Sequence, residues 1–222
     1  DSDISSAEMS GSDNSWTYSW NVPENNSGET ATVTVAGQDL FGNEYAGSTN
    51  IVYTIDNSAP AGYSVSIDQD YINDSNKTAL SFTFASAETG TTYNYSIDDT
   101  NESTTAVTGS GTISTATDQI TGIDVSSLDD DTLTLTVSLT DTAGNVGDSA
   151  TDTITKNITA PTVELSDDHD DLVVRNADTV TITATFSENM AATPTISIDV
   201  SGGSDSDISS AEMSGSDNSW TY

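Results

Sequence analysis

Acidic residues gather in short loops of this sequence, with a spacing that could hold a hard cation. Two loops within residues 61–160 have this composition, with Asp68, Asp70 and Asp74 in the first and Asp124, Asp129, Asp130 and Asp131 in the second. Calcium takes six to eight oxygen ligands from carboxylates, amides and carbonyls. The two loops are therefore candidate calcium sites, provided that the fold brings them to the same end of one domain.

The flanking parts of the chain hold matching loops. The acids in SDDHDD are Asp167, Asp168, Asp170 and Asp171, and those in PENNSGE, the predicted partner at the same end, are Glu24 and Glu29. Two D-x-x-G-N turns, Asp39 to Asn43 and Asp141 to Asn145, are expected at the opposite end, facing the preceding domain. No complete EF-hand loop occurs. Because Asp in such loops also makes turns and keeps a surface hydrated, the choice among these acids stays open.

Composition excludes several classes of partner and reaction. The 222 residues contain 36 Asp and Glu against 3 Lys and Arg, a formal net charge of −33, which repels nucleic acid and anionic membranes. No apolar run reaches the roughly 18 residues of a membrane span, so direct insertion is not expected. With no Cys and a single His, His169, a transition-metal site and a Ser-His-Asp triad are both poorly supplied. We therefore expect no enzyme activity.

The elements that position these loops are predicted to be strands. Apolar residues alternate with Thr and Ser in several runs, a period of two that is typical of half-buried strands. The clearest runs are residues 16–22, 51–55, 80–84, 133–139, 180–186 and 195–199. No segment has a helical apolar stripe, so the chain is predicted to be all-β. The alternation also places Trp16, Tyr18 and Trp20 in a core, although they could instead form a platform for a sugar.

The sequence also repeats. The eighteen letters DSDISSAEMSGSDNSWTY stand at residues 1–18 and again at 205–222, a period of 204 residues. A finer repeat lies inside it: DLFGN at 39–43 matches DTAGN at 141–145, and YTIDNSAP ending at Pro60 matches TITKNITAP ending at Pro161. The chain is therefore expected to be one period of a longer tandem array with a short overlap.

The finer repeat sets the expected domains. Residues 1–60 are predicted to be the C-terminal part of a module A, residues 61–160 a complete module B, and residues 161–222 the N-terminal part of the next module A. About 100 residues with some seven short strands is the size of an immunoglobulin-like sandwich. Residues 162–204 followed by 1–60 would reconstitute one module A. The fold predicted is thus tandem immunoglobulin-like β-sandwich modules in an extended array.

Two blocks of sequence resemble known repeats. Residues 163–199 followed by 16–60 resemble the bacterial immunoglobulin-like repeats of very large secreted surface proteins, and residues 63–73, 81–97 and 109–145 resemble a second such repeat. The family includes RTX-type and biofilm-associated adhesins, in which such modules act as spacers. The resemblance implies type I secretion, a location at the cell surface and joints stiffened by calcium.

The leading hypothesis for function is structural: a spacer repeat of a long extracellular fibre or adhesin, with calcium at the acidic loops and joints. Its expected partners are the neighbouring modules of the same chain. One alternative is a module that binds glycan or protein and is displayed many times. Another is lateral assembly into filaments, which at this charge would need bridging cations.

Overall fold

The computed structural model describes residues 4–23, 28–47, 49–169, 172–175, 177–201 and 207–222. These residues form seventeen strands, turns and irregular segments, and no helix, which confirms the all-β prediction. None of them belongs to a helix long and apolar enough to cross a membrane. The chain divides into two compact units, Asp1–Ile158 and Thr159–Tyr222.

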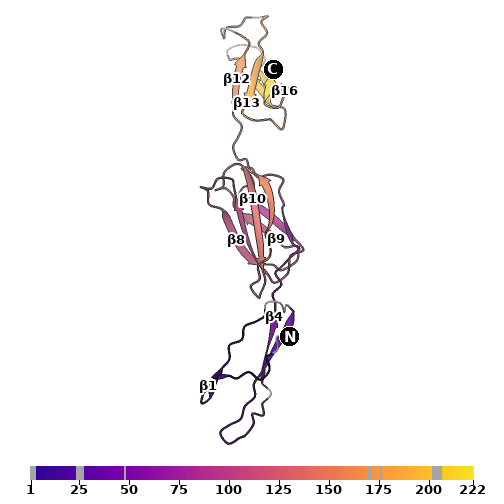
Figure 1. Cartoon of the computed structure of the whole chain (residues 1–222). Helices are drawn as coiled ribbons and strands as arrows, with labels where there is room; N and C mark the ends of the chain where they lie inside the picture. Colours follow the sequence, from indigo (N-terminus) through magenta and orange to yellow (C-terminus); the bar gives the residue numbers. More distant parts are fainter. Residues whose placement is uncertain (1–3, 24–27, 48, 170–171, 176, 202–206) are drawn as a thin grey trace. The chain divides into compact units, whose positions relative to one another are not determined.

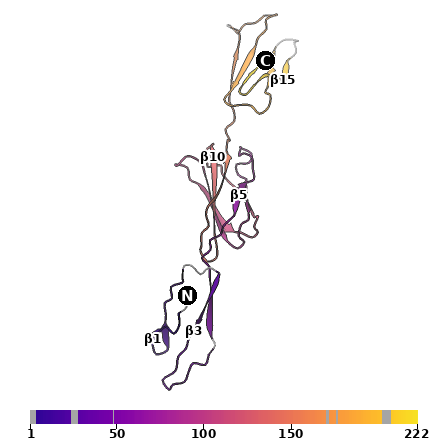
Figure 2. The same ribbon diagram turned by 45° about the vertical axis from the view of Figure 1, so that its right-hand side comes forward.

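Residues 61–158 form a β-sandwich of seven antiparallel strands (Figures 1 and 2). One sheet has the order β11-β10-β7-β8 and the other the order β5-β6-β9. The strands are β5 (Ser64–Ile67), β6 (Leu80–Ala85), β7 (Thr92–Asp98), β8 (Val107–Thr112), β9 (Gln119–Ile123), β10 (Thr132–Thr140) and β11 (Ala150–Thr155). The chain crosses between the two sheets after β6, after β8 and after β9.

One hydrophobic core lies between these two sheets. Every second residue of β10, from Leu133 to Leu139, is fully buried, as the alternation predicted. Aromatic rings of the two sheets meet across the core, with centroids 5.6 Å apart for Phe82 and Tyr95 and 5.8 Å apart for Phe84 and Tyr93. Such tilted and edge-to-face pairs add to the free energy gained from burial.

The described strands within residues 4–60 instead form two separate hairpins (Figure 2). Their strands are β1 (Ser10–Ser12), β2 (Ser15–Thr17), β3 (Glu29–Thr34) and β4 (Asn50–Ile55). Among the described residues of this part, only Ile55 and Pro60 are buried. The prediction that Trp16 and Tyr18 lie in a core is wrong for this segment, because both are about half exposed and no second sheet covers them.

The second unit, Thr159–Tyr222, contains one sheet of order β12-β13-β17-β16 and one pair, β14-β15. Its strands are β12 (Val163–Asp167), β13 (Ile182–Phe186), β14 (Thr195–Ile198), β15 (Ile208–Glu212), β16 (Ser214–Ser216) and β17 (Ser219–Thr221). Its small core consists of Ala184, Met213 and Trp220, with Phe186, Met190 and Ile196 packed against them.

Candidate functional sites: acidic loops and the turn at the joint

The two acidic loops of residues 61–158 lie at one end of the sandwich. The amide of Val125 donates to the carbonyl of Lys77 (2.8 Å), which joins the second loop to the first. The amide of Asn157 donates to the carbonyl of Ile72 (2.9 Å), so the chain leaving β11 runs beside the first loop. The fold thus brings the two loops to the same end of one domain, which is the condition that the sequence analysis set for them.

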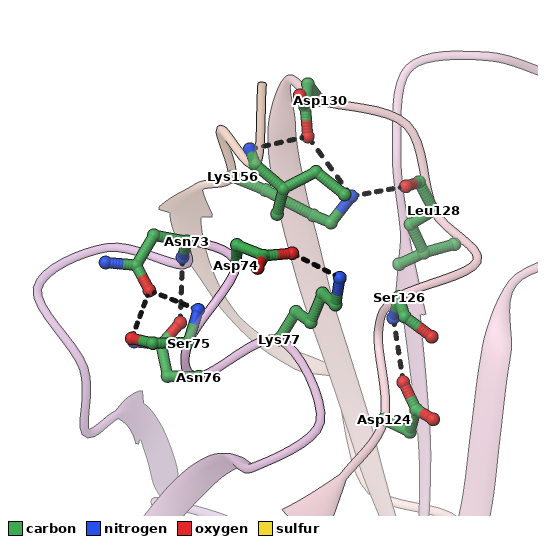
Figure 3. Close-up of polar contacts among 11 residues, drawn as sticks. Asn73, Asp74, Ser75, Asn76, Lys77, Asp124, Ser126, Leu128, Asp130 and Lys156 are labelled. Atoms are coloured by element: carbon green, nitrogen blue, oxygen red, sulfur yellow. Dashed lines mark hydrogen bonds and ion pairs between the residues drawn. The ribbon is translucent and has the colours of Figure 1, made fainter. Parts of the chain in front are cut away.

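Two lysines occupy the space between these loops (Figure 3). Lys77 forms an ion pair with Asp74. The ammonium of Lys156 is buried and donates to the carbonyl of Leu128 (2.6 Å) and to Asp130 (3.2 Å). Asp130 also accepts the backbone amide of Ile158 at 3.1 Å. Since Asp74 and Asp130 each face a lysine, part of the negative charge predicted to attract calcium is already balanced within the protein.

The remaining acids of the first loop do not point to the second. Asp68 accepts hydrogen bonds from Ser81 (2.6 Å), Thr83 (2.8 Å) and Gln119 (2.9 Å), which ties it to strands β6 and β9. Asp70 is exposed.

Asp124, in the second loop, accepts the backbone amide of Ser126 (2.9 Å). The hydrogen bonds from Ser126 and the charge of Lys77 lower the pKa of Asp124.

The hydrogen bonds of Asp68 predict a measurable acid sensitivity. Burial raises the pKa of Asp68, but the bonds from Ser81, Thr83 and Gln119 outweigh burial and lower the pKa below its ordinary 3.8. Because the folded pKa lies below the unfolded one, this carboxylate stabilises the fold above about pH 4, and the contribution is lost as pH falls through the folded pKa. In the Asp68→Asn variant, the free energy of unfolding should therefore decrease less between about pH 5 and pH 2 than it does in the unaltered chain. Urea titrations at each pH would measure it, and an unchanged slope would contradict the assignment.

One acid that lies beside the second loop, Asp99, was not selected from the sequence. The loop after β7 brings Asp99 to Asp129, whose amide donates to the Asp99 carboxylate at 2.6 Å. Asn101 donates to the Asp129 carboxylate (2.8 Å), and the Thr100 hydroxyl donates to Asp131. The pKa of Asp131 is lowered by the bonds from Thr100 and from the amide of Thr132. The paired acids of SIDDTNES, directly after a strand, were the signal that could have indicated this loop.

No group of three or more His, Cys, Asp or Glu side chains surrounds one point suited to a metal ion in the part of the chain that the structure describes. The oxygens of the Asp99, Asp129 and Asp131 cluster suit calcium chemically. In the structure, however, they accept N–H and O–H donors and do not converge. Calcium binding by these loops stays a prediction.

The loop predicted in module A is described only in part. Glu24, Asp170 and Asp171 lie outside the described residues. Asp167 accepts the amide of His169 (2.9 Å), and Asp168 accepts the amide of Thr181 (2.8 Å), which lowers the pKa of Asp168. Nδ1 of His169 lies 3.5 Å from Asp168, too far for a strong hydrogen bond. Asp167 therefore stabilises a local turn, and Asp168 holds the loop to the residue just before β13.

The two D-x-x-G-N turns have the conformation expected from their sequence. In each, the Asp carboxylate accepts two backbone amides and the side-chain amide of the Asn, and the Gly has a positive φ, 83° at Gly42 and 94° at Gly144. The bond from the Asn side chain is the main reason that the pKa values of Asp39 and Asp141 are lowered. The carboxylates predicted as cation ligands thus organise turns between the last two strands, β3-β4 and β10-β11.

The second of these turns also contacts the joint segment, which we define as residues 56–63. Asn145 donates from its side chain to the carbonyl of Asp56 (3.0 Å). The hydroxyl of Tyr63 donates to the carbonyl of Asp148 (2.5 Å) and accepts the amide of Leu139 (3.1 Å). A Cβ at Gly147 would lie 2.2 Å from the carbonyl oxygen of Pro60, so only glycine permits this approach. The joint segment is therefore fixed on the sandwich by hydrogen bonds and close packing.

A pair of matched variants isolates the contribution of Asn145 to the joint. Asn145→Ala removes the turn bonds and the bond to Asp56, whereas Asn43→Ala removes the equivalent turn bonds in DLFGN. Because of the extra hydrogen bond, Asn145→Ala should lower the free energy of opening of the joint segment by about 1 kcal/mol more than Asn43→Ala does. Hydrogen exchange of residues 56–63 measures this directly. Equal protection of those amides in both variants would show that Asn145 does not hold the joint.

Comparison with known proteins finds similarity to solved structures only. No family model matches the chain, and no curated protein matches it. Among solved structures, it is similar to one described as the crystal structure of a tetra-tandem repeat in the extending region of a large adhesion protein. That match has 24% sequence identity and a TM-score of 0.41, and it covers 87% of this chain and 47% of that one. The chain thus spans about half the length of the structure it matches.

Proposed function

We propose that this chain is a spacer repeat of a long extracellular adhesion protein, made of tandem immunoglobulin-like sandwiches. The observation that carries the proposal is the fixed joint segment. Asn145, Gly147 and Tyr63 hold residues 56–63 against the end of the sandwich. A spacer needs repeated joints of defined geometry, and a period of 204 residues supplies the same joint in every copy.

We further propose that calcium stiffens the repeat. The support is electrostatic: with 36 acids and 3 bases, the chain repels itself unless cations screen it. We assign the ion to the loops of Asp99, Asp129 and Asp131, because the lysines already neutralise Asp74 and Asp130. Binding would require these carboxylates to exchange their present donors for the ion.

Thermal unfolding in EDTA and in millimolar calcium tests this part. For a dissociation constant of roughly 10⁻⁴ to 10⁻³ M, a hundredfold excess of calcium adds about 2.7 kcal/mol, seen as a rise of several degrees in Tm. The double variant Asp129→Asn, Asp131→Asn should lose the rise, and Asp70→Asn, in the other loop, should keep it. If calcium does not change the Tm of the unaltered chain, the acids only keep the surface hydrated. In that case the spacer role would rest on the joint alone.

We propose a cell-surface location and no catalytic role, in keeping with the acidic composition and with side chains committed to turns. Small-angle scattering of the chain with Asn145→Ala tests the spacer role itself. Weakening the joint should broaden the distribution of distances within the particle, and an unchanged distribution would contradict a stiffening function for this contact.

A further inference from the structure

The repeated eighteen-residue segment occurs in two different environments within this one chain. Several local features of its described residues are the same in both copies. The residues with positive φ are equivalent, Ser6 (57°) with Ser210 (50°) and Asp13 (55°) with Asp217 (54°). Both copies form the same hairpin, β1-β2 and β16-β17, in the same register. The local sequence therefore determines the backbone of this hairpin.

The hydrogen bonds inside the hairpin are also repeated. In each copy the threonine hydroxyl donates to a backbone carbonyl across the hairpin at 3.2 Å. In each copy the tryptophan Nε1 donates to the carbonyl of the turn aspartate, at 3.3 Å in one and 3.1 Å in the other. Since these contacts are equal, any difference between the copies comes from what lies around them.

Burial is the feature that differs. Trp220 is 8% exposed, whereas Trp16 is 53% exposed, and Met213 is buried whereas Met9 is half-buried. The letters ISSAE form strand β15 at residues 208–212 but no strand at residues 4–8. The second copy thus gains both a strand and a core that the first copy does not have.

The cause is the segment that precedes the second copy. Strand β13 pairs with β17 and sets Ala184 opposite Trp220, with Thr183 opposite Thr221. Strand β14 pairs with β15 and sets Ile196 opposite Ala211. Residues 163–198 therefore cover the hairpin and complete its sheet.

We propose that residues 4–18 bind the segment 159–204 of a preceding copy of this repeat within one continuous polypeptide. In this arrangement, strand β13 of the preceding copy pairs with β2. Ala184 of the preceding copy then lies opposite Trp16, and Thr183 of the preceding copy lies opposite Thr17. The inference rests on the tandem arrangement in the proposed function but not on calcium. It makes the module formed from residues 159–204 and the following 1–60 the folding unit of this half of the repeat.

A continuous chain fits this pairing better than exchange between separate molecules. Asp205 is the repeat of Asp1 and directly follows Ser204. In a continuous array, Ser204 of the preceding copy would therefore directly precede Asp1. In a separate molecule, the edge of β13 is already filled by its own β17. An incoming β2 would have to displace an identical strand, with no net gain in pairing.

The same comparison argues against a glycan platform that uses Trp16. A ligand platform stays exposed in the assembled protein. The tryptophan of the identical second segment is instead packed with Ala184 and Met213. We therefore assign the exposed face of residues 4–18 to β-sheet completion.

The test places a copy of residues 159–204 directly ahead of Asp1 in the full chain and follows Trp16 alone. Trp20→Phe and Trp220→Phe, made in the original and in the extended chain, leave Trp16 as the one tryptophan. In EDTA, the emission of Trp16 should move to shorter wavelength in the extended chain. Its quenching by acrylamide should fall to the level of a chain that keeps only Trp220.

A matched variant controls for nonspecific covering. Ala184→Glu in the added copy alone puts a charge opposite Trp16, so quenching should return to that of the original chain. Equal quenching of Trp16 in the original and extended chains, with hydrogen exchange at Ser15–Thr17 also unchanged, would overturn the proposal. Concentration-dependent shielding of Trp16 in the original chain, with dimers in sedimentation, would overturn the continuous-chain arrangement in favour of separate copies. Since no calcium is present, neither result depends on the calcium proposal.

Discussion

Leu135→Ala is expected to destabilise the sandwich of residues 61–158 by about 2–5 kcal/mol. Leu135 lies at the centre of β10, is fully buried, and belongs to the core between the two sheets. The change removes apolar contacts and leaves a cavity that the paired strands cannot close. Against a typical domain stability of about 5–15 kcal/mol, this loss would be a large fraction of the total.

Hydrogen exchange of the amides in β10 measures this effect in the sandwich itself. Tryptophan fluorescence would not, because the three tryptophans all lie outside residues 61–158. Leu40→Ala is the matched control: the same atoms are removed from a side chain that is fully exposed in the DLFGN turn. It should change the free energy of opening by less than about 0.5 kcal/mol. Similar effects of the two variants would mean that the two sheets do not form a single packed core.

Lys156→Met is expected to cost about 2–3 kcal/mol, although lysine is usually a surface residue. Its side chain is 1% exposed, and its ammonium satisfies the carbonyl of Leu128 as well as Asp130. Methionine keeps the apolar length of the side chain, so the loss comes from the unsatisfied carbonyl of Leu128 and from the Asp130 carboxylate, which keeps the amide of Ile158 but loses its charged partner. Asp130 is 27% exposed, and water screens part of that penalty.

Lys77→Met removes the same charge from the same end of the sandwich and serves as the control. The Lys77 and Asp74 side chains are both more exposed, so their ion pair should be worth about 0–1 kcal/mol. Urea unfolding followed by far-UV circular dichroism would compare the two variants at equal net charge. If both cost the same, the burial of Lys156 does not fix the second acidic loop.

Several features of the acidic loops could be predicted because they are local. The D-x-x-G-N turns follow from an Asp that accepts nearby amides and a Gly with positive φ, and both turns have this form. The ion pair of Lys77 with Asp74 is local as well, because the two residues stand three positions apart in the chain. The role of Lys156 could not be predicted, because it depends on a carbonyl 28 residues away in the chain.

The cluster of Asp99, Asp129 and Asp131 shows the same limit. Each acid is visible in the sequence, but their approach requires the ends of β7 and β10 to be neighbours in one sheet. Sequence spacing gives no register between strands that lie far apart in the chain. For that reason Asp68 and Asp124, grouped by composition, have different partners in the structure.

By itself, the sequence determined the alternating strands of residues 61–158, the turns and the repeat, since alternation, glycine conformation and short-range hydrogen bonds act over a few residues. The segment that occurs twice makes the division clear. Its hairpin is the same at Trp16 and at Trp220, because the same local forces act on the same letters. Only the tertiary structure decided that Trp220 is buried and Trp16 is exposed. Burial depends on a second layer of strands, and residues 163–198 provide that layer for the second copy.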